Sequence, residues 1–197
     1  MILSDFIEYV DCLFPSVSES VKNKAKECVD QFRETNSTIN YLMSEPLSEL
    51  SQGDIISNIP FCVFVTDTGE LRRFLSPGMV ISTSCDIDNH DFISIVPLYS
   101  IHQYGGNKEA ILSNECLQYM YLPDTKVEDY FIDFGIICSY EKDLIIGSIN
   151  SGRTVRMASL SQIGYYFLIC KLSAFLLRRE DTITKYKRVQ EIETRLN

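Results

Sequence analysis

GDIISNIPFCVFVTDTGELRRF (residues 53–74) decides how this chain is expected to fold. Its first half is rich in β-branched and aromatic side chains, which favour extended strands. Asp67-Thr68-Gly69 is a typical turn sequence, because aspartate bonds nearby backbone and glycine accepts a positive φ. The segment ELRRF then returns as a second strand. The stretch therefore predicts two antiparallel strands joined by a tight turn.

More strand patterns follow along the chain, separated by turns and not by long helices. Asn150-Ser151-Gly152 is another turn signal, in front of RTVRM. We expect the further strands in that segment and at residues 79–83, 92–99, 116–122, 130–139 and 144–149. Six or seven short strands at this spacing are typical of a small antiparallel barrel. The predicted class is therefore α+β, built on a small antiparallel β-barrel.

Helices are expected on both sides of this barrel. Ser16 and Glu19 have capping-box spacing, and apolar residues recur after them at helical intervals. The segment TINYLM (38–43) predicts one more helical turn. Residues 163–177 are apolar on nearly all sides, which predicts a helix buried on most faces, with Ser159 at its cap.

These patterns divide the chain into three parts. We predict an N-terminal helical extension at residues 1–50 and a barrel domain with its closing helix at residues 51–177. A charged C-terminal arm follows at residues 178–197, because the sequence changes there from apolar to charged.

Charge is spread unevenly along the chain. Residues 1–152 carry 9 basic and 23 acidic side chains, whereas residues 153–197 carry 9 basic and 4 acidic ones. The acidic body argues against general nucleic-acid binding, because it would repel phosphates. The basic end has three candidate partners: an acidic protein, a nucleic acid, or the acidic body of a second copy.

No segment predicts secretion or membrane insertion. The stretch MILSDFIEYVD lacks the basic region and cleavage site of a signal peptide, and the apolar stretch at 163–177 is too short for a bilayer. The seven cysteines form no CxxC pair, and most lie in apolar runs, where a free thiol behaves as a small buried hydrophobe. We therefore expect a cytoplasmic protein in a reducing compartment, with no membrane partner.

The polar loop that begins at Ser84 raises a catalytic question. Cys85 is a candidate nucleophile if His90 or His102 lowers its pKa, with Asp86 or Asp88 orienting that base. In the other interpretation Cys85 is buried at a strand end, and the neighbouring acids satisfy backbone donors of a turn. The sequence leaves both interpretations open.

No metal or cofactor site is predicted. Asp86, Asp88 and Asp91 lack the glycine and the closing glutamate of a calcium loop. Gly105-Gly106 is not followed by the Lys-Ser/Thr of a phosphate loop. We interpret the acids of the next strand region as isolated side chains on a solvated face: Glu128, Asp129 and Asp133.

Three short pieces carry a resemblance: Gly53-Asp54 before a strand, Pro77-Gly78-Met79-Val80-Ile81-Ser82, and Ile95-Val96-Pro97. Over residues 52–177 their order resembles the MazF/PemK family of toxins, SH3-like barrels that cut RNA as dimers. The resemblance implies an SH3-like barrel and is compatible with a homodimer. Ser76 stands where the family has its catalytic arginine, and Tyr99 stands where it has its catalytic threonine, so the family's chemistry does not carry over.

Two functions follow as expectations. The first is a non-catalytic protein-interaction module. The resemblance places it as an accessory or regulatory subunit of a bacterial complex, in toxin–antitoxin or phage-defence systems. Its contacts would come from exposed apolar and aromatic side chains such as Tyr99, Tyr104, Tyr119 and Tyr121, for which a place in the core is the alternative. We expect a protein partner rather than a nucleic acid bound by the basic arm.

The second expectation is an endoribonuclease of the MazF type with a relocated active site. Arg72 or Arg73 would supply the cation over the scissile phosphate, and Ser100 would lie in the same pocket. His102 would act as the acid and base.

Overall fold

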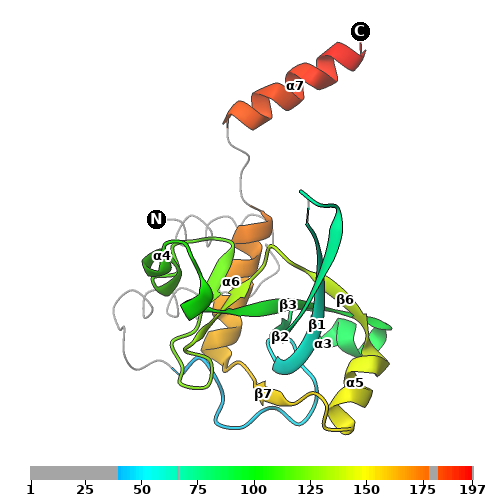
Figure 1. Ribbon diagram of the computed structural model, residues 1–197, viewed down its shortest axis with the longest axis vertical. Helices are drawn as coiled ribbons and strands as arrows, with labels where there is room; N and C mark the ends of the chain where they lie inside the picture. Colours follow the sequence, from blue (N-terminus) through cyan, green and yellow to red (C-terminus); the bar gives the residue numbers. More distant parts are fainter. Residues whose placement is uncertain (1–39, 66, 178–181, 197) are drawn as a thin grey trace, which may run out of the picture.

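The computed structural model describes residues 40–65, 67–177 and 182–196 (Figure 1). The helices expected before residue 40 lie outside this part, and the predicted boundaries between the three parts stay predictions. The described strands are β1 (Ile55–Val65), β2 (Glu70–Val80), β3 (Phe92–Ser100), β4 (Tyr119–Tyr121), β5 (Tyr130–Asp133), β6 (Cys138–Glu141) and β7 (Arg156–Ala158). The described helices are α3 (Ser84–Asn89), the 3₁₀ turn η1 (Ile101–Gln103), α4 (Lys108–Leu112), α5 (Lys142–Asn150), α6 (Gln162–Leu176) and α7 (Thr182–Leu196).

In the described residues the strands form one sheet in the order β4-β5-β3-β2-β1-β7. Strand β3 is central: β2 pairs with one edge, while β5 and β6 share the other. Every one of these pairs is antiparallel, which confirms the predicted mixture of helices with an antiparallel sheet. The sheet is not closed, because the pairing stops at β4 on one side and at β7 on the other.

The hairpin predicted from residues 53–74 is present as β1 and β2. Its register runs from Phe61 opposite Phe74 to Val65 opposite Glu70. Gly69 has a φ of 68°, a left-handed conformation that glycine adopts without steric cost. Figure 1 shows the hairpin extending beyond the rest of the sheet.

Several predicted strands differ from the observed ones. The strand expected at 79–83 is the end of β2, and only Tyr119–Tyr121 of the strand expected at 116–122 are extended. Residues 144–149 lie in helix α5, because Ile145 and Ile149, four residues apart, both pack into the cluster around Phe61. A short apolar run cannot distinguish a strand from a buried helix. The strand expected at 130–139 is interrupted between β5 and β6, where its register against β3 shifts.

Helix α6 is buried as predicted. It packs beneath the sheet, where Phe167 and Leu168 join the main core with Leu98, Met120 and Ile132. The cap is Ser161 and not Ser159, because the Ser161 side chain accepts a hydrogen bond from Gly164 N. Figure 1 shows α6 crossing behind the strands.

The segment before the sheet also belongs to this core. Leu42 forms an antiparallel bridge with Leu160, and Tyr41 packs its ring against Phe167. The helical turn expected at 38–43 is therefore wrong for residues 40–43, whose backbone is not helical.

Asp54, from the Gly-Asp pair, links the start of β1 to the segment before α6 through its side chain. Its carboxylate is fully buried and accepts hydrogen bonds from Ser159 Oγ at 2.5 Å and Ser51 N at 2.9 Å. Arg156 Nη1 lies 3.8 Å from the same carboxylate. Burial raises the pKa of Asp54 despite these partners, whose contributions oppose the shift. The Gly-Asp pair thus has a structural role.

Figure 1 shows α7 lying apart from the sheet. Among the described helices, none combines the length and the apolar character needed to cross a membrane.

Candidate functional site

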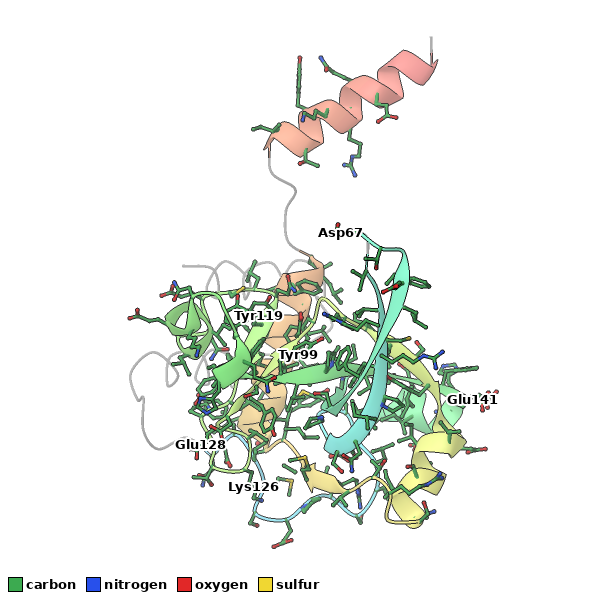
Figure 2. The ribbon with its side chains drawn as sticks, viewed as in Figure 1. Asp67, Tyr99, Tyr119, Lys126, Glu128 and Glu141 are labelled. Atoms are coloured by element: carbon green, nitrogen blue, oxygen red, sulfur yellow. The ribbon has the colours of Figure 1, made fainter. Side chains whose placement is uncertain are left out.

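A pocket of about 370 Å³ opens where β3, β4 and β5 meet the β2 strand of the hairpin. The residues of these strands alternate between two faces. Leu98, Met120 and Ile132 face α6, so their neighbours face the pocket. The lining residues are Arg72, Tyr99, Ser100, Gln103, Tyr104, Tyr119, Phe131, Asp133 and Ile136. Figure 2 shows two of them, Tyr99 and Tyr119, close together on the sheet.

Four of the nine lining residues are aromatic, and their rings pack on one another. Phe131 is buried, and the rings of Tyr104 and Tyr119 meet it edge to face, with centroids 5.3 and 5.0 Å away. The ring centroid of Tyr99 lies 6.0 Å from that of Phe131, and the Tyr99 ring stacks on Phe74 of the hairpin. Rings that pack on one another in this way have little freedom to rotate, so the wall is preformed.

Asp133 provides a buried carboxylate in this aromatic wall, at only 8% exposure. Its Oδ1 atom accepts hydrogen bonds from Gln118 Nε2 at 2.9 Å and Gly135 N at 2.8 Å. The side chain lies opposite Tyr119 in the β4–β5 register. The prediction that Asp133 lies on a solvated face is wrong, because Gln118 and Tyr119 lie beside its side chain and it is buried.

The hydroxyls of Tyr99 and Tyr119 stay protonated at neutral pH. Burial, with the Asp133 charge and Tyr104 adding to it, raises the pKa of Tyr119 to about 12. Burial and Asp133 also raise the pKa of Tyr99, although Arg72 opposes that shift. The pocket therefore offers neutral phenols beside one basic and one acidic side chain.

A buried lysine of α6 supports the pocket from behind. Lys171 is 1% exposed and donates hydrogen bonds to Asn114 O at 2.9 Å and Cys116 O at 2.7 Å. The Asn114 side chain in turn bonds both backbone groups of Tyr121. Lys171 thus fixes the loop from which β4, with Tyr119, begins.

The candidate ribonuclease residues are only partly brought together. Arg72 and Ser100 line the pocket. Arg73 follows Arg72 in β2 and so points to the other face of the strand. The His102 ring is exposed and bonds Asp129 at 2.7 Å, and neither residue lines the pocket. Ser76, at the position of the family's arginine, donates a hydrogen bond to Leu98 O.

The Cys85 candidates lie at the opposite end of β3, in and beside helix α3. Thr83 caps this helix, which replaces the expected loop, and Cys85 is exposed and not buried. The Cys85 thiol accepts a hydrogen bond from Asn89 Nδ2 at 3.5 Å. His90 instead faces Asp86 at 3.6 Å. The structure therefore pairs the histidine with the acid but not with the thiol.

A shallow hollow of about 470 Å³ beside α3 contains His90 and Asp86 but not Cys85. Within the part of the chain that the structure describes, no group of three or more His, Cys, Asp or Glu side chains is placed to hold a metal ion. Among the described cysteines, Cys170 is buried, whereas Cys62 and Cys85 are exposed.

Three of the four tyrosines named from the sequence as contacts line the pocket, namely Tyr99, Tyr104 and Tyr119. Sequence reasoning missed Phe131, Gln103 and the burial of Asp133. The alternation FIDF contained a signal for Asp133, because it sets Phe131 and Asp133 on one face of a strand.

Searches against protein-family models and against curated proteins find no match to this chain. The resemblance to the MazF/PemK family therefore stays a prediction.

Proposed function

We propose that this protein is a non-catalytic binding module that holds a protein partner through the aromatic pocket. One observation carries the proposal: three tyrosines and Phe131 converge with a buried carboxylate on one face of the sheet. Tyrosine-rich, preformed pockets of this kind are typical of protein-interaction hot spots, because they give large contact area at low entropic cost.

The proposal extends to the cellular role expected from the sequence. The protein acts in the cytoplasm as an accessory or regulatory subunit of a bacterial complex of the toxin–antitoxin or phage-defence type. This part rests on the resemblance of residues 52–177 to the MazF/PemK family.

A pocket-filling variant tests the proposal. Gln103 is exposed and lines the pocket, so Gln103→Trp fills the site without altering the core. Gln162→Trp, at the exposed start of α6, adds the same side chain elsewhere. Affinity purification should recover partners with wild type and Gln162→Trp but not with Gln103→Trp. Recovery of the same partners by all three proteins would contradict the proposal.

The endoribonuclease is the second candidate, because Arg72 and Ser100 line the same pocket. Purified protein is incubated with mixed RNA, with and without EDTA. The binding-module proposal predicts no cleavage above that of the Arg72→Ala variant. Cleavage by wild type that disappears in Arg72→Ala and in Ser100→Ala would favour the ribonuclease.

A further inference from the structure

The carboxylate of Asp133 has no cationic partner in the described part of the chain. The ion pairs there involve other acids, and the nearest bonds to Asp133 come from an amide and a backbone N–H. A carboxylate that is removed from water is stabilised strongly by a positive charge brought next to it. The pocket therefore contains an acceptor that a cation would satisfy.

The surrounding rings favour the same kind of group. The π faces of tyrosine and phenylalanine carry negative potential, and a cation within about 6 Å of a ring centroid is attracted to it. Tyr99, Tyr104 and Tyr119 are half-buried, so part of each ring remains open to the pocket.

The charge of the whole sheet region adds a weaker, long-range contribution. Residues 40–177 carry 16 acidic and 8 basic side chains. An excess of negative charge steers cationic partners toward the surface and speeds their association. Arg72 on the pocket rim works against this, and its removal is therefore informative.

We infer that the pocket takes a basic side chain, arginine or lysine, of the protein partner, with its charge toward Asp133 and its stem against the tyrosine rings. This inference rests on the proposed binding function and names the chemistry of its partner. Of the two basic side chains, the flat guanidinium of arginine suits stacking on rings best.

Tyrosine-ring NMR with the full chain tests the inference. The probes are the acetylated and amidated tripeptide Gly-Arg-Gly, its citrulline counterpart, which has nearly the same shape without the charge, and inorganic phosphate. The arginine peptide should shift the ring signals of Tyr99, Tyr104 and Tyr119, whereas the citrulline peptide and phosphate should not.

Two variants then separate a cation site from an anion site. Asp133→Asn keeps an oxygen acceptor for Gly135 and Gln118 but loses the charge, so the arginine peptide should bind about tenfold more weakly. Arg72→Ala removes a positive charge that repels the arginine peptide from the pocket rim. The variant should therefore bind this peptide about threefold more tightly. Phosphate binding that is lost in Arg72→Ala would overturn the inference.

The experiments distinguish a wrong ligand class from a wrong binding-module proposal. If partners are lost with Gln103→Trp but the arginine and citrulline peptides bind alike, the ligand class is wrong and the binding module stands. If partners are kept with Gln103→Trp, the binding module itself is wrong.

Discussion

Three charged side chains are buried among the described residues, and each is satisfied differently. Asp54 is held by Ser159 and Ser51, and Lys171 by two backbone carbonyls. Asp133 alone faces a pocket. At the residue scale the first two therefore fix the fold, whereas the third has a charge available to a ligand.

Lys171 should make stability depend on pH in the alkaline range. Burial lowers its pKa from 10.5 to about 8. Between these values the unfolded chain binds more protons, so the free energy of unfolding rises with pH, by about 3 kcal/mol in total. Below pH 8 Lys171 is protonated in both the folded and the unfolded chain, and the folded state bears the full cost of burying the ammonium group.

Urea unfolding of wild type and Lys171→Met at pH 7 to 10 measures this effect, since other titrating groups cancel in the difference. Wild type should gain stability relative to the variant as the pH rises from 8 to 10. Lys108→Met, at an exposed position, controls for the loss of a lysine. A difference that is flat over this range would contradict the assignment.

At the scale of elements, local patterns predicted what local forces determine. The hairpin was predictable because its strand residues and its turn are contiguous. Helix α5 was not, because its two isoleucines are buried by partners from distant strands. The same limit applies to the pocket: Arg72, Ser100 and three tyrosines could be named from the sequence. The burial of Asp133 could not be predicted, although the alternation FIDF sets it on the face of Phe131, because that burial depends on the pairing of β4 with β5.

Two helical glycines should respond in opposite directions to alanine. A Cβ on Gly164 would lie 2.1 Å from the backbone oxygen of Tyr41, so Gly164→Ala should destabilise the fold by about 1–3 kcal/mol. A Cβ on Gly147 would meet nothing within 4 Å. Gly147→Ala should therefore stabilise α5 by roughly 0.5–1 kcal/mol, because alanine loses less entropy in a helix.

The midpoints of urea unfolding for the two glycine variants give the comparison directly. Equal shifts of the same sign would show that the close approach between α6 and the Tyr41 segment is not as described.

At the scale of the whole molecule, the sheet has two faces with different roles. One face packs on α6 and forms the main core, and the other carries the pocket in its β3–β5–β4 part. The rings that line the pocket pack on Phe131, Ile101 and Ile111 in a cluster of their own. The pocket can therefore change its occupant without disturbing the core, as a binding module requires.

Photo-cross-linking in the source cells shows whether a protein partner occupies the aromatic pocket. A benzoylphenylalanine is placed at Gln103 on the pocket or, as a control, at Gln162 on α6. We expect an adduct with a partner protein from position 103 that is weakened by Asp133→Asn, and no such adduct from position 162. The same adduct from position 162, or none from position 103, would contradict it.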